Sequence, residues 1–187
     1  MLMSANPQSQ TYDTIEVGTR LTSGGRTISE SDHGLFVLLS GDWHAIHCDA
    51  AYAATTPLGR RLVHGTLGIA VALGSLEAQV LRVADTLIAA LGISEWNYQA
   101  PIFLGDTLHI EMEIAEKRIT RSGDRYVLRR HIRLINQDGV VVQEGKVASI
   151  FALPPAQQPL VRRTPGDRSR RSKEKAFRLQ QTESSRK

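Results

Sequence analysis

The sequence predicts an α+β fold in which long antiparallel strands curl around one central helix. In the segment Thr66–Arg82 apolar residues recur at helical spacing, and the first half of the segment carries no charged side chain on any face. A helix that is apolar all round is buried, so other parts of the chain must cover it. After Asp106 apolar and polar residues alternate, which is typical of strands with one buried and one solvated face. The sheet is therefore expected to wrap the helix.

Four long strands are expected in the second half of the chain. They are the segments 95–103, 106–119, 124–136 and 140–153. The sequences "RSGD" and "NQDG" separate the last three strands, and their glycines supply the positive φ that hairpin turns require. Residues 84–91 are expected to continue the central helix or to form a second helix.

The first third of the chain is expected to hold short elements. Residues 13–32 are interpreted as a strand, a Gly-Gly turn and a second strand. Ser31 or Asp32 is the expected N-cap of a short helix that ends at Gly41, because glycine tolerates the left-handed conformation at a helix terminus. Asp49 is expected to cap a further helix through "AAYAAT".

Length and composition indicate one domain with flexible ends. The 187 residues are 41% hydrophobic, which is enough for a single core. Ten of the 23 Lys and Arg residues but only three of the 19 Asp and Glu residues lie in Arg162–Lys187, so this segment carries about +7 and the chain before it about −3. We expect a flexible N-terminus over residues 1–12, a domain over 13–154 and a basic, disordered tail over 155–187.

The same features predict the compartment and exclude some partners. Cys48 is the only cysteine, so no internal disulfide can form, which fits a reducing cytoplasm. The first residues lack the basic and apolar regions of a secretory signal, and the most apolar window, Leu62–Leu76, is too short to cross a membrane. The tail lacks interleaved aromatic residues and an amphipathic pattern, so we expect it to be solvated and to bind neither nucleic acid nor membrane.

The stretch Ser40–Ala53 gathers several proton-handling groups. Asp42 and His47 are five positions apart, an offset that would point them in different directions on a regular helix. They converge only if Gly41–Ile46 forms a turn ahead of the helix capped at Asp49. A carboxylate and an imidazole that converge on one cavity form a suitable acid and base pair.

A second motif, His64-Gly65-Thr66, lies where a loop leads into the central helix. Backbone N–H groups at a helix N-terminus are free donors at the positive end of the helix dipole, and they can hold a developing oxyanion. Glycine at position 65 lets a ligand approach the backbone closely. An acid and base pair facing such donors suits addition or elimination beside a carbonyl group.

The two motifs together resemble a known family. "FVLLSGDWHAIHCDAAYA" followed by "RLVHGTLGIAV" is similar to the signature of the MaoC-like dehydratases, which include the (R)-specific enoyl-CoA hydratases. The resemblance spans roughly residues 14–153. It implies a hotdog fold, an antiparallel sheet wrapped around a long central helix, that is usually paired into a homodimer with the two sheets joined. It also implies reversible hydration of a trans-2-enoyl-CoA to a 3-hydroxyacyl-CoA.

The resemblance also implies roles for single residues. The family's catalytic pair falls on Asp42 and His47, which would orient and deprotonate water and protonate the α-carbon. The N–H of Gly65 would bind the thioester oxygen. His64 and His44 are assigned to the same binding site, His64 as a residue that fixes the loop and His44 as a pocket wall or hydrogen-bond partner. No metal and no redox cofactor is implied, and coenzyme A enters only as part of the substrate.

The chain departs from the family signature at two positions. His44 stands where Asn is usual, and Ala45 stands where Pro is usual. The missing proline is the less expected change, because proline normally stiffens this turn. Both changes leave the substrate pocket and the orientation of the acid and base pair open.

Other interpretations stay open at this point. A hotdog thioesterase has the same fold and ligand but hydrolyses the thioester, and a non-catalytic acyl-CoA-binding subunit would not transform it at all. A metal site is also conceivable, with His44, His47, Asp49 and His64 as ligands. Cys48 is expected to be a buried small thiol. Arg60 and Arg61 are interpreted as solvated loop charges in preference to contacts with the phosphates of coenzyme A.

Overall fold

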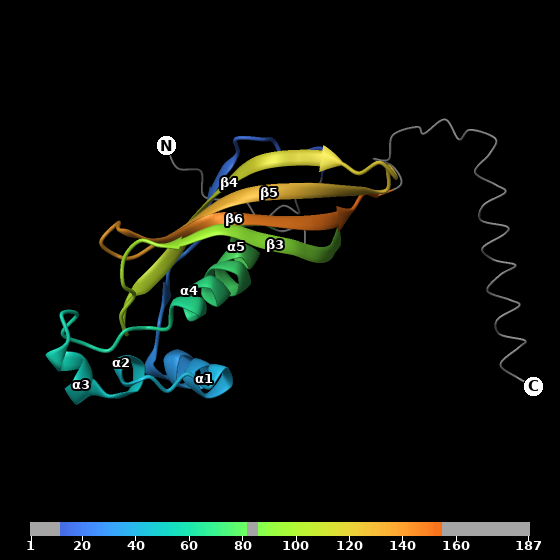
Figure 1. Ribbon diagram of the computed structural model, residues 1–187. Coiled ribbons are helices and arrows are strands. Elements are labelled where there is room, and N and C mark those ends of the chain that lie inside the picture. Colours follow the sequence, from blue (N-terminus) through green and yellow to red (C-terminus); the bar gives the residue numbers. More distant parts are fainter. Residues whose placement is uncertain (1–11, 82–85, 155–187) are drawn as a thin grey trace, which may run out of the picture. The chain divides into compact units, whose positions relative to one another are not determined.

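The computed structural model describes residues 12–81 and 86–154. The predicted flexible N-terminus, except for Tyr12, and the predicted disordered tail at residues 155–187 lie outside these residues. Within them an antiparallel sheet covers one side of a central helix, and a group of short helices lies beyond the N-terminal end of that helix (Figure 1). No helix in this described part of the chain is long and apolar enough to span a membrane.

Four long strands form the body of the sheet, and two short ones extend it. The strands are β1 (Arg20–Thr22), β2 (Arg26–Thr27), β3 (Leu87–Tyr98), β4 (Thr107–Ile119), β5 (Arg125–Ile135) and β6 (Val141–Ala152). Their order is β1-β4-β5-β6-β3, with β2 also paired to β4, and all pairs are antiparallel. The predicted hairpin turns are confirmed, with Gly123 at φ 75° and Gly139 at φ 76°. β3 ends at Tyr98, short of the predicted residue 103.

The predicted alternation on the strands is confirmed by burial. The inward-facing residues of β4 are at most 1% exposed, and they are Leu108, Ile110, Met112 and Ile114. On β5, Ile132 and Leu134 are fully buried in the same core. One face of the sheet therefore packs against the central helix, as a half-buried antiparallel sheet requires.

β1 and β2, the two strands expected over residues 13–32, do not pair with each other across the Gly-Gly turn. Thr22 lies opposite Glu111 of β4, and Arg26 lies opposite Leu108 of the same strand. The two short strands therefore run in one direction along β4, and the glycines between them interrupt the edge without reversing it. A long neighbour offers both segments main-chain partners, whereas a lone hairpin of two or three residues per strand is marginal.

β3 begins earlier than the sequence pattern indicates. The helix expected over residues 84–91 is wrong for Leu87–Leu91, which form the first part of β3. Residues 82–85 lie outside the described part of the chain. Leu and Ala are good helix formers, but pairing with β6, such as Leu87 opposite Phe151, overrides that local preference.

The central helix contains a wider turn in its middle. It consists of α4 (Gly65–Val71), a π-helical segment (Ala72–Leu76) and α5 (Glu77–Val80). The helix prediction is confirmed as far as Val80, and Arg82 lies outside the described residues.

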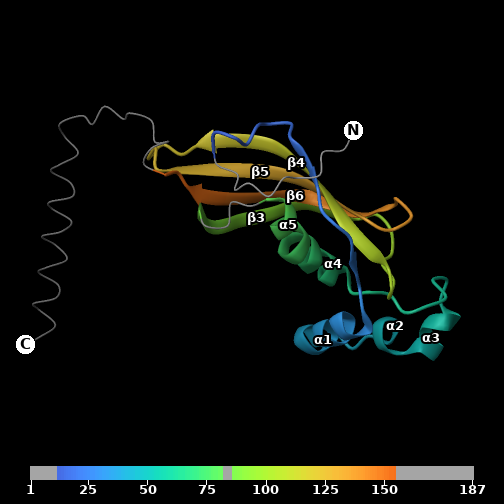
Figure 2. The ribbon, with the colours of Figure 1, turned by 180° about the vertical axis from the view of Figure 1, so that it is seen from behind.

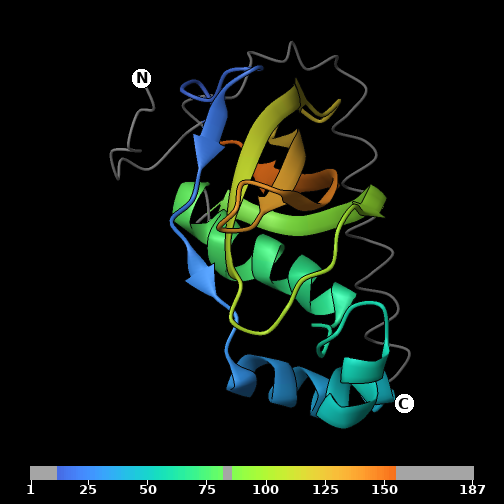
Figure 3. The same ribbon diagram turned by 90° about the vertical axis from the view of Figure 1, so that its left-hand side faces the viewer.

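One side of this helix faces the sheet (Figure 3). The side chains that it buries there are Leu67, Val71, Ala72, Leu76 and Val80. Ile69 and Leu73 are only partly buried. The sheet thus packs on one side of the central helix, and the predicted burial of the helix against a wrapping sheet is confirmed on that side.

Three short helices carry the first motif, and they are α1 (Glu30–Ser40), α2 (Ala45–Cys48) and α3 (Ala50–Thr55) (Figure 2). Ser29 caps α1 in place of the predicted Ser31 or Asp32. Its Oγ accepts the N–H of Asp32 at 3.1 Å, and the Asp32 carboxylate accepts the N–H of Ser29, so the two residues form a capping box. The other predicted boundaries are confirmed, because Gly41 ends α1 at φ 71° and Asp49 caps α3.

A buried ion pair joins the central helix to the sheet. Glu77 of α5 and Arg130 of β5 have side chains that are 14% and 2% exposed, and Arg130 also donates to Oγ of Ser149 at 2.6 Å. Burial raises the pKa of Glu77 and lowers that of Arg130, although each charge favours ionisation of the other. Because each charge is tolerable in the core only with its partner, the pair fixes α5 against β5.

We predict that Glu77→Ala lowers the free energy of unfolding by about 3 kcal/mol, because it leaves Arg130 buried and unpaired. The double variant with Arg130→Met should lose less than the single variant. The control is Glu111→Ala, which breaks an exposed pair with Arg133 and should cost less than about 1 kcal/mol. Chemical denaturation followed by circular dichroism measures all three, and equal losses for the buried and exposed pairs would contradict the prediction.

Candidate active site

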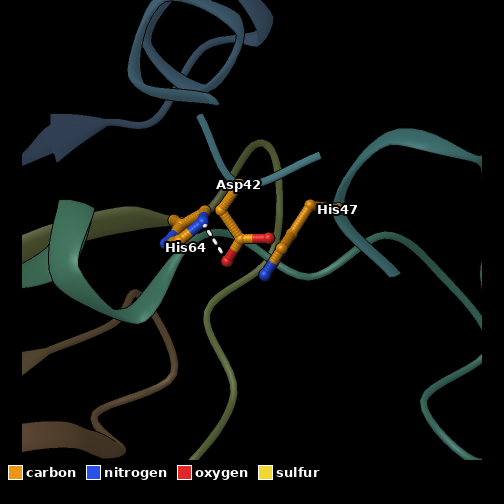
Figure 4. Close-up of side chains that lie close together, drawn as sticks. All are labelled: Asp42, His47 and His64. Atoms are coloured by element: carbon orange, nitrogen blue, oxygen red, sulfur yellow. Dashed lines mark ion pairs between the residues drawn. The ribbon is translucent and has the colours of Figure 1, made fainter. Parts of the chain in front are cut away.

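Asp42 starts the turn between α1 and α2. Gly41 in the left-handed conformation bends the chain out of α1, and Oδ1 of Asp42 then accepts the backbone N–H of His44 at 3.1 Å. This local hydrogen bond fixes the side chain, which is 46% exposed. The carboxylate lies next to both His47 and His64, with one oxygen within 4.8 Å of a ring nitrogen of each (Figure 4). The turn that the sequence required for convergence is therefore present.

His47 lies in the short helix α2 and is almost buried, at 9% exposed. Its Nδ1 lies 2.7 Å from the carbonyl oxygen of Leu62. A carbonyl oxygen only accepts, so Nδ1 carries the proton and donates it to this bond. Nε2 of the neutral ring therefore keeps a lone pair, and the ring is held in place for proton transfer.

His64 is the N-cap residue of α4. It contacts both members of the predicted acid and base pair, which the sequence did not indicate. Its Nε2 lies 2.9 Å from Oδ2 of Asp42, and its ring stacks on His47 with a centroid separation of 4.3 Å. Its Nδ1 lies 3.2 Å from Oγ1 of Thr66. The predicted pair of Asp42 and His47 does come together, and His64 joins it as a third member.

Each charge in the cluster changes the pKa of its neighbours. The backbone N–H of His44 lowers the pKa of Asp42 most, and the positive forms of His64 and His47 lower it further. Burial lowers the pKa of His64, and His47 adds to this effect, whereas Asp42 raises it. An ionised carboxylate beside a neutral His64 is the state that these directions favour.

The sheet holds the first turn of α4 through one buried side chain. Nε2 of Gln143, on β6, donates to the carbonyl oxygen of Gly65 at 2.9 Å, and its Oε1 accepts from the indole N–H of Trp96 at 3.2 Å. A Cβ at Gly68 would lie 2.4 Å from Nε2 of the same amide, so a larger residue there would displace the Gln143 side chain. The first intrahelical bond comes from Leu67, which leaves the N–H groups of Gly65 and Thr66 without an intrahelical acceptor.

A cavity of about 590 Å³ opens beside this turn. Its lining comes from the loop before α4, the start of α4 and the segment after β3, and comprises His47, Leu62, Val63, His64, Gly65, Thr66, Tyr98, Gln99, Ala100, Pro101, Ile102 and Gln143. Asp42 contacts His64, which lines the cavity, but Asp42 does not itself line it. The cavity thus brings two imidazoles and the free N–H groups of α4 to one space.

The departures from the family signature keep the local geometry. His44 is the N-cap of α2, and its Nδ1 accepts the N–H of Ile46 at 3.2 Å, which is the capping bond an Asn side chain can make. Ala45 occupies the first helical position, where proline is favoured but alanine also fits. His44 is exposed and does not line the cavity, and its ring centroid lies 6.5 Å from that of His47.

The neighbouring residues fall into place around the cluster. Asp49 caps α3 through Oδ1, and it is not among the donors that converge with His47 and His64 in the described part of the chain, so the metal site considered from the sequence does not form with that set. Cys48 is exposed, contrary to the expectation of a buried thiol. Arg61 pairs with Glu30 at 2.5 Å, and the guanidinium of Arg60 lies over the ring of Phe103.

Two site residues escaped sequence reasoning. His33 of α1 is 3% exposed, and its Nε2 lies 3.1 Å from the carbonyl oxygen of His47. Gln143 is 1% exposed on the inner face of β6. The signal in each case was a polar residue within an apolar pattern, "HGLFVLL" for His33 and "VVVQEG" for Gln143. A buried polar side chain needs a partner, and here the partner is the backbone of the site.

The geometry agrees with comparisons to known proteins. A family model described as the MaoC like domain matches residues 14–132. The chain belongs to this family. It is 31% identical over 121 residues to Protein MaoC of Klebsiella aerogenes, a match covering 64% of this chain but only 35% of that protein. It is 28% identical over 132 residues to the (R)-specific enoyl-CoA hydratase of Aeromonas caviae, covering 71% and 92% of the two chains.

Two solved structures share its fold. The unliganded R-hydratase of Pseudomonas aeruginosa aligns with a TM-score of 0.62 at 32% identity, over 82% of this chain and 96% of that one. A double hotdog protein of Mycobacterium tuberculosis aligns with a TM-score of 0.69 at 18% identity, over 81% and 46%. The α+β arrangement of sheet and central helix is therefore a hotdog fold, as predicted.

We predict that Asp42→Asn lowers the pKa of His64 further below its ordinary value, because the substitution removes the negative charge that raises it. Histidine NMR titration measures the shift, with Asp138→Asn in the β5–β6 turn as the control. A rise in the pKa of His64 in Asp42→Asn would show that the carboxylate is not its principal charged partner.

Proposed function

We propose that this protein is a hydratase/dehydratase that adds water reversibly to the double bond of a 2-enoyl-CoA to give a 3-hydroxyacyl-CoA. The observation that carries the proposal is the convergence of the Asp42 carboxylate and Nε2 of His47 beside the free N–H of Gly65. The names of the Aeromonas and Pseudomonas relatives support the same reaction class. The chain spans about a third of the length of the Klebsiella protein, so no property of that protein is carried over to this chain.

In the proposed mechanism the histidine and the carboxylate share one water molecule. Nε2 of His47 accepts a proton from the water, while the ionised Asp42 holds the second hydrogen and fixes the direction of attack. The oxygen adds to the β-carbon, and the electron pair of the double bond moves toward the thioester carbonyl. The imidazolium then returns a proton to the α-carbon, so both groups end in their starting protonation states. Dehydration follows the reverse steps.

The thioester oxygen becomes negative midway through this sequence, and we assign the N–H of Gly65 to stabilise it. The N–H stands at the positive end of the α4 dipole and needs no reorganisation when charge develops. Gln143 holds the carbonyl group of the same residue, which restrains the turn that presents the N–H. His64 supports Asp42, and His44 shapes the turn that carries the pair.

The proposal needs no metal and no redox cofactor, since coenzyme A is part of the substrate. It includes a homodimer joined along β3. This strand ends the sheet among the described residues, and its exposed large apolar side chains are Leu87, Ile88, Leu91, Ile93 and Tyr98. A long apolar edge strand is a template for pairing. Because Tyr98 also lines the cavity, a second copy there would lie beside the substrate. The cytoplasmic location stays a prediction.

We predict that Asp42→Asn and His47→Gln each lower the rate of enoyl-CoA hydration by roughly 10²–10⁴-fold, the range for loss of a general acid or base. The assay follows loss of the conjugated thioester absorbance with crotonyl-CoA and a longer enoyl-CoA. Asp138→Asn and His131→Gln are matched controls away from the site. Retention of most activity in Asp42→Asn would refute the catalytic pair, and release of free thiol would indicate a thioesterase.

A pair of substitutions at one position tests the oxyanion donor. Gly65→Ala keeps the N–H but places a Cβ 2.8 Å from the ring of Tyr98, so that ring must move. Gly65→Pro makes a similar contact and also removes the N–H, at a helix position that proline tolerates. We predict that Gly65→Pro hydrates enoyl-CoA roughly 10²-fold more slowly than Gly65→Ala. Equal rates for the two variants would remove Gly65 from the mechanism.

A further inference from the structure

The centre of the site has the composition of a transition-metal centre. Asp42, His47 and His64 each offer one donor atom, and the three atoms lie within 4.8 Å of one another. In Figure 4 each ring presents a nitrogen on the side of the carboxylate. Two imidazoles and one carboxylate suit Zn²⁺ and similar ions, whereas Mg²⁺ and Ca²⁺ prefer sites made of oxygen ligands.

Both histidines have the outer contacts that metal-binding histidines usually have. Nδ1 of His47 donates to the carbonyl oxygen of Leu62, which directs the lone pair of Nε2 into the cluster. Nδ1 of His64 lies 3.2 Å from Oγ1 of Thr66. Nε2 of His64 is buried and lies 2.9 Å from Oδ2 of Asp42, a contact that a shared metal ion would replace. The Nδ1 contacts thus orient both rings, so that Nε2 of each ring is the atom left for a metal ion.

We propose that Asp42, His47 and His64 bind one divalent transition-metal ion of the Zn²⁺ type, and that this ion inhibits the protein. A tetrahedral Zn²⁺ holds its donors roughly 3.3–3.4 Å apart. The side chains must therefore draw together, and Asp42, which is half-exposed and anchored through Oδ1, has Oδ2 to offer to the ion. The fourth position faces the cavity lined by both histidines.

Inhibition follows from the atoms that the ion occupies. Nε2 of His47 bound to Zn²⁺ can neither accept a proton from water nor return one to the α-carbon, and the Asp42 carboxylate is engaged as well. Inhibition by the ion therefore rests on the proposed function. Metal binding itself does not, because it needs only the three donor atoms.

Several other potential metal-binding side chains can be told apart from this site by substitution. Asp49 caps α3, and Nδ1 of His44 accepts a backbone N–H. Cys48 is an exposed free thiol, and His131 lies on β5. Residues 155–187 contain no histidine or cysteine. Cys48→Ser and His131→Gln are therefore controls for adventitious binding.

Isothermal titration of the full chain with ZnCl₂, after treatment with EDTA and dialysis, tests the binding. We expect one ion per chain, no binding of Mg²⁺, and at least about a tenfold loss of affinity in each of Asp42→Asn, His47→Gln and His64→Gln. Cys48→Ser and His131→Gln should bind as the unsubstituted protein does. Circular dichroism checks that each variant is folded. Absence of binding, or loss of binding in Cys48→Ser alone, would overturn the proposal.

Two further measurements keep the test decisive if a variant fails to fold. Co²⁺ bound to the unsubstituted protein should give the intense visible bands of a four-coordinate ion and perturb the NMR signals of His47 and His64. Weak six-coordinate bands, or unperturbed signals, would overturn the site. If hydration is confirmed, Zn²⁺ should suppress it and EDTA restore it, and undiminished turnover at saturating Zn²⁺ would refute inhibition. A protein that binds Zn²⁺ but hydrates nothing would refute the proposed function and leave the metal site standing.

Discussion

The hydrogen bond from Gln143 on β6 to the carbonyl oxygen of Gly65 connects the sheet to the candidate active site. It fixes the start of the central helix, and the adjoining His64 is thereby fixed as well. Glycine at position 68 leaves the space that the amide occupies, and a Cβ there would displace it. A buried amide with both ends paired is stable where an unpaired one would be costly. The same hydrogen bond therefore sets both the packing of the central helix on the sheet and the geometry of the polar cluster.

The loop before the helix completes this connection. The N–H of Leu62 donates to the carbonyl oxygen of Ile46, and the N–H of Val63 donates to that of Ile102. The carbonyl oxygen of Leu62 in turn holds His47. Three segments that are far apart in the sequence thus meet through main-chain groups, which side-chain substitution does not remove. The same logic explains the altered signature, because a histidine at position 44 makes the same kind of capping bond as asparagine.

Most of the fold was accessible from the sequence, and the exceptions have physical causes. Alternation predicted β4, β5 and β6, because their environments differ between two faces. The start of β3 was missed, because Leu87–Leu91 has helix-forming residues whose conformation is decided by pairing with β6. The motifs predicted that Asp42 and His47 converge. No local pattern places His64 against Asp42 or Gln143 under Gly65, since those contacts exist only after helix and sheet have docked.

The irregular backbone of β3 affects how readily this edge of the sheet pairs with strands of other molecules. Its pairing with β6 shifts register between Leu87 and Ala89, between Ala90 and Gly92 and between Ser94 and Asn97, and Glu95 adopts a positive φ of 52°. A bent strand is a poor template for a straight foreign one. Amyloid-like stacking, which requires long flat strands, is disfavoured on this edge despite its apolar side chains. Because of these distortions, only a strand with matching bends can pair with this edge.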